Sequence, residues 1–223
     1  MDAQRLSVVI PALNEARGIR AALEALAPLR ARGHEVIVAD GGSTDATVQL
    51  AQPLCDRVVQ GMRGRARQMN AGAGAASGQA LLFLHADTRL PANADRLVFQ
   101  GLSLARWGRF DVRIEGSHPM LKVVAGAMNL RSRVTGIATG DQAIFVRREA
   151  FAGFPEIALM EDIAFSSAMK RGGPPACLRS RAVTSGRRWE SRGVLRTVVL
   201  MWQLRLLYFF GVAPECLARR YHA

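Results

Sequence analysis

Short apolar runs that alternate with helical stretches fill the first 90 residues, and this order limits the possible folds more than any other feature. The expected strands and helices there are strands at 6–11, 35–39, 57–59 and 80–84, and helices at 16–29, 44–51 and 68–76. The strands are rich in Val, Ile and Leu, whereas the helices carry apolar residues at helical spacing. Alternation of this kind is typical of parallel βαβ units and predicts an α/β domain with a mostly parallel sheet.

The second half of the chain is less regular. Its expected elements are strands at 110–114, 142–147 and 182–184, helices at 121–131 and 161–171, and a long apolar helix at 194–212. The long segment contains Arg196 and Arg205, which are costly inside a bilayer, so it predicts an amphipathic helix and not a spanning one. We therefore expect one domain over residues 1–190 and a C-terminal helical appendage over 191–223.

Composition limits the partners and the location of the chain. Its 223 residues carry a formal net charge of +12, and Lys122 and Lys170 are the only lysines. Arginine binds two phosphate oxygens at once, so this balance suits phosphorylated substrates or an anionic membrane face. No dense basic run with interleaved aromatic residues is present, which argues against nucleic acid. Three scattered cysteines and the absence of a signal-peptide pattern predict a cytoplasmic protein.

Polar residues follow the first two expected strands, in the segments VVIPALNE (8–15) and ADGGSTD (39–45). Ligands of open α/β sheets bind beyond the carboxyl ends of the strands, where these residues fall. The Asp40 carboxylate can accept a hydrogen bond from a uracil or a ribose, and Gly41 allows the backbone to approach a ligand closely. The alternative for each segment is an ordinary turn that caps a helix.

Two further segments carry acidic residues. FLHADT (83–88) follows the expected strand at 80–84, and Asp87 there suits a Mg²⁺ or Mn²⁺ ion that also holds a diphosphate. His85 could bind the softer of these metals or contact the sugar. MED (160–162) opens an expected helix, where one carboxylate near the reacting sugar would be a general base. Acids in a first helical turn are also common for electrostatic reasons alone.

Together with RRW (187–189), these segments resemble the family 2 glycosyltransferases. The resemblance implies a GT-A fold, which is Rossmann-like with helices on both faces of its sheet. It further implies nucleotide-sugar binding by a set of residues at the strand ends, namely Pro11, Ala12, Asn14, Glu15, Asp40, Gly41, Arg65, His85, Ala86 and Asp87. Asp87 matches the metal-binding second acid of the family's DxD motif, and Asp162 matches the usual base, with Asp141 and Glu161 as further catalytic candidates. His85 replaces the first acid of DxD, and the Gln of the family's QxxRW motif is missing.

A narrower resemblance rests on GRARQMN (64–70), HADT (85–88), GDQ (140–142) and RRWE (187–190). These segments are similar to a bacterial branch of selenium-associated transferases that includes selenosugar synthases of the selenoneine pathway. The resemblance implies transfer of glucose or N-acetylglucosamine from UDP to selenophosphate. Paired arginines suit such a compact anion. The candidate arginines, divided between UDP and this acceptor, are Arg65, Arg67, Arg131, Arg133, Arg187 and Arg188, of which Arg67, Arg187 and Arg188, with Trp189, are assigned to the acceptor phosphate.

Other functions fit parts of the sequence. A family 2 enzyme could transfer sugar to a hydroxyl, including one on a lipid carrier, with residues 194–212 lying on the membrane surface. The same helix could instead mediate oligomerisation. A non-catalytic UDP-sugar-binding regulator is a third class, against which the acids Asp87, Asp141 and Asp162 argue because a decayed site would not need them.

Overall fold

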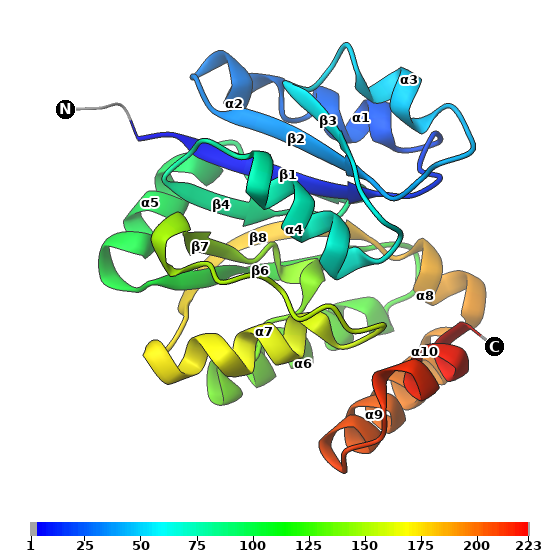
Figure 1. The fold of residues 1–223 in the computed structure, drawn as a ribbon. Helices are drawn as coiled ribbons and strands as arrows, with labels where there is room; N and C mark the ends of the chain where they lie inside the picture. The colour runs from blue at the N-terminus through cyan, green and yellow to red at the C-terminus, as the bar shows by residue number, and fades with distance from the viewer. Residues whose placement is uncertain (1–3, 223) are drawn as a thin grey trace.

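One eight-stranded sheet runs through the computed structural model, which describes residues 4–222 (Figure 1). Its strands are β1 (Leu6–Ala12), β2 (Glu35–Asp40), β3 (Arg57–Gln60), β4 (Ala80–Phe83), β5 (Thr88–Arg89), β6 (Trp107–Glu115), β7 (Phe145–Arg147) and β8 (Ala176–Ser185), in the order β3-β2-β1-β4-β7-β6-β8-β5. Strands β3, β2, β1 and β4 are parallel, as are β6 and β8, whereas β7 and β5 run antiparallel to their neighbours. The predicted α/β sheet is confirmed.

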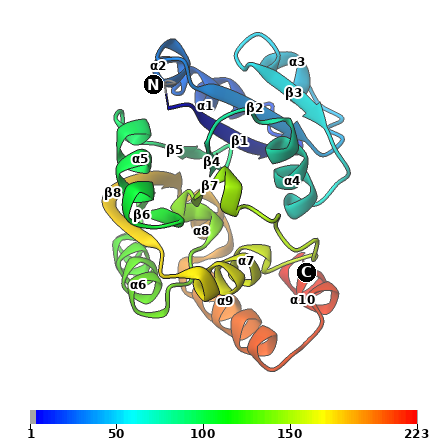
Figure 2. The same cartoon turned by 60° about the vertical axis from the view of Figure 1, so that its left-hand side comes forward.

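Helices cover both faces of the sheet, as the sequence predicts (Figure 2). They are α1 (Ile19–Glu24), α2 (Ala27–Ala31), α3 (Thr47–Ala51), α4 (Arg65–Ala75), α5 (Ala94–Leu104), α6 (Met120–Thr135), α7 (Glu161–Met169), α8 (Arg187–Arg192), α9 (Val194–Phe209) and α10 (Pro214–His222). Short 3₁₀ turns lie at Gly140–Gln142, Arg148–Ala150 and Lys170–Gly172. The strand β5 and the helices α5, α8 and α10 had no counterpart in the sequence prediction.

Three predicted elements were wrong in their bounds. The single helix expected at 16–29 is split into α1 and α2, because Pro28 in the first turn of α2 has no N–H with which to continue α1. The helix expected from residue 44 begins at Thr47, since Ser43 and Thr44 bond to the neighbouring loop instead of capping it. Gln142 belongs to a 3₁₀ turn and not to β7.

The strand expected at 182–184 is also longer than predicted, because β8 spans ten residues. Residues 176–181 of β8 include the exposed Arg179 and Arg181, and the others are only partly buried, so this stretch lacks the apolar alternation by which strands are recognised. β8 is nevertheless paired with β6 over most of its length, with an irregularity between Phe110 and Asp111 of β6.

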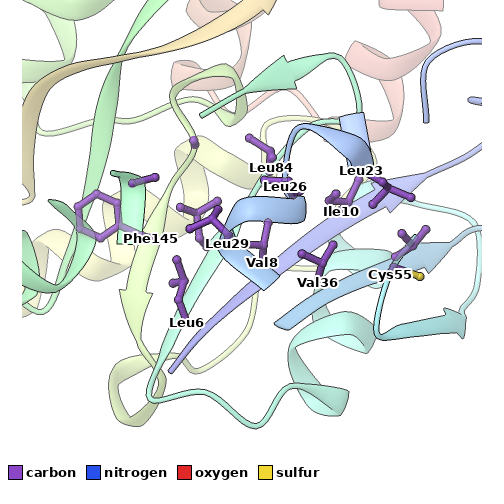
Figure 3. Packing of buried hydrophobic residues seen from close by; sticks show 14 of the residues in the cluster. Leu6, Val8, Ile10, Leu23, Leu26, Leu29, Val36, Cys55, Leu84 and Phe145 are labelled. Carbon is purple, nitrogen blue, oxygen red and sulfur yellow. The ribbon is translucent and has the colours of Figure 1, made fainter. Parts of the chain in front are cut away.

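Alternate residues of the central strands feed two separate cores. Val8 and Ile10 of β1 point into a cluster that α1, α2, α3 and α5 cover, part of which Figure 3 shows. Val9 points to the opposite face, where α4 and α7 pack. The approach of α4 is close, because a Cβ atom on Gly72 would lie 2.4 Å from Val9 Cγ1. Both faces of β1 are therefore buried, and its residues form a continuous apolar run.

The C-terminal helices α8, α9 and α10 lie beyond α6 and α7, at the end of the molecule away from β3 (Figures 1 and 2). Val194 of α9 joins the cluster between β6 and α6, and Leu204 and Leu217 pack on Met160 before α7. Within residues 4–222 no helix is both long and apolar enough to cross a membrane. The division at residue 190 stays a prediction, but residues of α9 and α10 pack directly against the first domain.

Candidate active site

The carboxyl ends of β1 and β2 form one continuous edge, because Ala12 and Asp40 are paired in register. Asn14, just beyond β1, has a φ of 56°. Its backbone and its side chain both bond to the loop after β2. Its amide donates to Ser43 Oγ at 2.9 Å, and its Oδ1 accepts from the amide of Thr44 at 2.9 Å. The two segments that the sequence singled out are therefore brought together.

Asp40 is buried at this edge, with 1% of its surface exposed. Its carboxylate accepts hydrogen bonds from the amides of Gly42 and Ser43, each at 2.9 Å, and from the hydroxyl of Ser43 at 2.5 Å. A side chain on Gly41 would collide with Gln68, since a Cβ atom would lie 2.8 Å from Gln68 Cδ. Asp40 thus shapes the loop, and any ligand that reaches it meets a carboxylate that is already held in place.

The end of β4 lies next to the end of β1 and carries the second acidic group. Asp87 is exposed, and its Oδ1 is 3.4 Å from Thr88 Oγ1 and 3.5 Å from Thr184 Oγ1. Partial burial and the charge of Asp87 raise the pKa of Glu15, while Arg187 and His85 oppose this shift. Two carboxylates and a guanidinium from three separate segments thus act on one another at this edge.

His85 links this edge to the loop before β7. Its Nδ1 lies 3.3 Å from Asp141 Oδ1, and its ring packs against Gly140. The amide of Gly140 donates to Asp162 Oδ2 at 3.0 Å, and the amide of Ile163 donates to Asp162 Oδ1 at 2.8 Å. The three residues that the sequence placed in separate motifs, His85, Asp141 and Asp162, therefore form one connected group.

Glu161 lies beside this group at the start of α7, where Met160 adopts a left-handed backbone conformation with φ of 71°. Burial raises the pKa of Glu161, as does the charge of Asp162, while Arg65 lowers it. Arg65 Nη1 lies 3.4 Å from Glu161 Oε1. Neighbouring carboxylates thus gather around one arginine of α4, which brings the GRARQMN and MED segments together.

The arginines that the sequence offered for the acceptor divide into several groups. Arg67 pairs with Glu156 at 3.2 Å on the surface, and Arg133 pairs with Asp111 at 2.8 Å. Arg188 donates to the hydroxyl of Tyr221 and lies 5.0 Å from the centre of its ring. Trp189 packs with the apolar cluster between β6 and α6. The roles of Arg67, Arg187, Arg188 and Trp189 in acceptor binding stay predictions.

Three arginines have a buried Nε atom with no hydrogen-bond partner, namely Arg109 on β6, Arg131 on α6 and Arg205 on α9. Arg109 is ion-paired with Asp111, whereas Arg131 and Arg205 form no ion pair with a carboxylate among the described residues. Asp162 and Asp141 act electrostatically on Arg205, and Asp162 acts on Arg131. Arg205 was missed in the sequence, where it counted only as a polar residue of an apolar helix.

No group of three His, Cys, Asp or Glu residues within the described part of the chain is placed to hold a metal ion. A single carboxylate is nevertheless sufficient when phosphate oxygens complete the shell, as Mg²⁺ commonly binds. The exposed carboxylate of Asp87 fits this arrangement, and a cation there would reduce its repulsion of Glu15.

Comparison with solved structures defines the fold. The mannosyltransferase PcManGT of Pyrobaculum calidifontis, solved with GDP-Man and Mn²⁺, superposes with a TM-score of 0.67 at 19% identity, covering 99% of this chain and 70% of that one. TarS of S. aureus, solved with UDP-GlcNAc, gives a TM-score of 0.66 at 18% identity over 82% of this chain and 58% of that one. The fold is therefore the GT-A fold of nucleotide-diphospho-sugar transferases.

Sequence comparison defines the family of the N-terminal part. Residues 7–102 match the model of Glycosyl transferase family 2. A PGL/p-HBAD biosynthesis glycosyltransferase of Mycobacterium tuberculosis is 31% identical over 157 residues, which cover 66% of this chain and 57% of the relative. The chain thus spans little more than half the length of this relative. Residues 7–102 are therefore similar to Glycosyl transferase family 2.

Proposed function

We propose that the chain transfers a sugar from a UDP-sugar, and that the ends of β1, β2 and β4 hold the donor. The observation that carries this proposal is the convergence of Glu15, Asp40 and Asp87 at one sheet edge, opposite Asp162. Solved structures of the same fold contain UDP-GlcNAc in TarS and UDP-Glc with Mn²⁺ in glucosyl-3-phosphoglycerate synthase. These neighbours support a donor of the same chemical class.

Each part of this edge has a role in donor binding. Asp40 would accept from the uracil or ribose, and the backbone of Pro11 and Ala12, with Asn14 and Gly41, would flank the nucleoside. Asp87 would hold a Mg²⁺ or Mn²⁺ ion, which supplies charge neutralisation to the departing diphosphate. Arg65, His85 and Ala86 would face the sugar.

We further propose that the acceptor is selenophosphate, which the resemblance of residues 64–70, 85–88, 140–142 and 187–190 supports. Its selenium lone pair attacks the anomeric carbon while the bond from that carbon to the diphosphate oxygen breaks, and the electron pair leaves with UDP. Water then cleaves the phosphorus–selenium bond, which releases inorganic phosphate and a 1-selenosugar. Asp162 and Asp141 would orient the sugar, because neither needs to deprotonate an acceptor that is already anionic.

The experiment is a donor and acceptor panel. The chain is incubated with UDP-glucose and UDP-GlcNAc, each with and without selenophosphate, and released UDP is measured with the selenium-containing product. We expect UDP release that depends on selenophosphate and equals the selenosugar formed. UDP release that needs an alcohol and ignores selenophosphate would overturn the acceptor. No release or binding of UDP under any condition would overturn the donor as well.

A second candidate acceptor is the hydroxyl of a lipid-linked molecule at a membrane surface. One face of α9 supports it, because apolar side chains at helical spacing are exposed there, namely Leu195, Val199, Trp202, Leu206 and Phe209. Exposed arginines, including Arg192 and Arg196, flank this stripe. Sedimentation with vesicles of anionic lipid tests this candidate by comparing the native chain with Trp202→Glu. If the same amount of each is recovered in the unbound fraction, the candidate is removed.

A further inference from the structure

Arg205 lies on the face of α9 that is turned toward the start of α7. Met201 and Tyr208, one turn before it and one turn after it, pack in the cluster that contains Met160 and Ile163. Residues at these spacings share one side of a helix, so the Arg205 side chain leaves α9 on the side of Asp162. Its Nε atom is buried there with no hydrogen-bond partner.

Arg131 reaches the same region from α6. Its Nη2 donates to the carbonyl of Ile137 at 3.5 Å, in the segment that leads to Gly140. The amide of Gly140 in turn binds Asp162, so Arg131 lies beneath the loop that holds this carboxylate. Its Nε atom is likewise buried without a partner.

The two guanidinium groups are close enough to oppose one another. Burial, and then the positive charge of Arg205, lower the pKa of Arg131 to about 10. Burial also lowers the pKa of Arg205, although Asp162 and Asp141 oppose the shift. No ion pair joins either arginine to a carboxylate among the described residues, since Asp162 accepts from two backbone amides instead. A pair of desolvated cations with unused donors is stabilised by an anion that bonds to both.

We propose that Arg131 and Arg205 form the subsite for the phosphoryl group of the acceptor, beside Asp162. This assignment rests on the proposed function and names the part of the site that holds the acceptor. Two guanidinium forks match the tetrahedral oxygens of a phosphoryl group better than a single point charge would. Because Arg205 belongs to α9, the C-terminal helices complete the acceptor side of the site.

Inorganic phosphate is the probe for this subsite, titrated calorimetrically into the full chain saturated with UDP and Mg²⁺. Saturation occupies the donor diphosphate site, so the phosphate reports on the remaining anion site. We expect one phosphate to bind per chain. Arg131→Gln and Arg205→Gln should each weaken it by about tenfold or more, the effect of removing a charged hydrogen bond. Arg196→Gln, an exposed residue of the same helix, is the matched control and should bind phosphate normally.

Several results would overturn the assignment. One is an unchanged phosphate affinity in both variants, and another is no phosphate binding by the native chain. A third is a loss of UDP affinity in the variants as large as their loss of phosphate affinity, which would place the pair at the donor diphosphate. Arg205→Lys retains the charge without the fork and serves if Arg205→Gln does not fold. Arg205→Lys should still weaken the binding of phosphate, and normal phosphate binding by this variant would count against the proposed role of Arg131 and Arg205. The titration contains neither sugar nor selenium, so its outcome is independent of whether selenophosphate is the acceptor.

Discussion

His85 Nδ1 lies 3.3 Å from Asp141 Oδ1, and this contact joins the end of β4 to the loop that precedes β7. Burial alone would raise the pKa of Asp141, but the hydrogen bond and charge of His85, with Arg65 and Arg188, hold that pKa below its ordinary value. Asp141 is therefore a carboxylate at neutral pH, and it fixes the ring of His85 beside Gly140. The donor and acceptor sides of the proposed site meet at this contact.

The first prediction is that Gly140→Ala impairs transfer without unfolding the chain. A Cβ atom on Gly140 would lie 2.4 Å from His85 Nε2, so the ring must move and its contact with Asp141 must loosen. We expect kcat/KM to fall by about tenfold or more, because small misplacements of catalytic groups are costly. Gly126→Ala on α6 is the matched control, since a Cβ there meets nothing within 4 Å. Equal activity in the two variants would show that the position of His85 does not matter.

The second prediction concerns the nucleoside. Asp40→Ala should raise the Kd for UDP by about tenfold or more, as expected for one lost charged hydrogen bond. Asp45→Ala is the control, because its carboxylate also bonds within the loop, to Thr47 and to the amide of Ala16. Calorimetry with UDP measures both. An equal loss in the two variants would mean that Asp40 acts only through the shape of its loop.

The third prediction is metal dependence. Exhaustive chelation should abolish transfer, and Mg²⁺ or Mn²⁺ should restore it, because Asp87 and the diphosphate together supply the oxygen ligands that such ions prefer. Asp87→Asn should need a higher metal concentration for half-maximal activity, measured by titrating the metal at saturating donor. Full turnover of the native chain after chelation would show that arginines alone stabilise the departing UDP.

The sequence could place Asn14, Asp40 and Asp87 at one edge of the sheet, because each lies at the end of a strand or within a few residues of it. Parallel strands bring such ends together. Their roles in donor binding stay predictions. The acceptor side was harder to predict. Arg131 and Arg205 are separated by more than 70 residues, and only the packing of α6 against α9 brings their helices together. One signal for Arg205 was present, namely a charge on the same helical face as Met201 and Tyr208.

The boundaries failed for local physical reasons. Pro28 divides a helix that apolar spacing alone would join, and polar residues in β8 hide a strand that only its pairing with β6 reveals. The short strand β5 is stabilised by its partner, through Thr88 and Thr184, whose hydroxyl oxygens lie 3.0 Å apart. Such elements depend on tertiary contacts, which neither propensity nor periodicity encodes.

The fourth prediction concerns stability and lies away from the site. The Arg32 and His34 side chains bond to Asp95, at 2.7 and 3.0 Å, and hold its pKa at about 2 despite its burial, which alone would raise it. A carboxylate with a lowered pKa stabilises the fold above its unfolded pKa of about 4, and this contribution disappears as the pH falls toward 2. Asp95→Asn should therefore lower the free energy of unfolding by about 2 kcal/mol at pH 7.

Urea unfolding of both chains across pH 3 to 7 measures this difference, which should shrink toward the acidic end. Glu115→Gln removes an ion pair with Arg89 whose two side chains are more than half exposed, and it should change stability little. A difference for Asp95→Asn that stays constant with pH would contradict the assignment of its stability to the charged carboxylate.

The last prediction compares Asp162 with Arg205 and separates the two proposed acceptors. An alcohol is almost fully protonated at neutral pH, so its transfer needs a positioned carboxylate, and general base catalysis is typically worth about 10²–10⁴-fold. Selenophosphate is already anionic and needs cationic positioning instead. With selenophosphate, Asp162→Asn should therefore reduce kcat/KM less than Arg205→Gln does. With an alcohol acceptor the order should reverse.

Steady-state kinetics of both variants with selenophosphate decide between these orders. The backbone amides of Gly140 and Ile163 hold the Asp162 carboxylate, and neither of these hydrogen bonds involves Arg205. The two substitutions therefore remove separate interactions. A rise in KM for selenophosphate in Arg205→Gln, with kcat less affected, is the signature of lost acceptor binding. Near-total loss of activity in Asp162→Asn beside near-normal Arg205→Gln would instead require Asp162 in the chemical step and would remove Arg205 from the acceptor subsite.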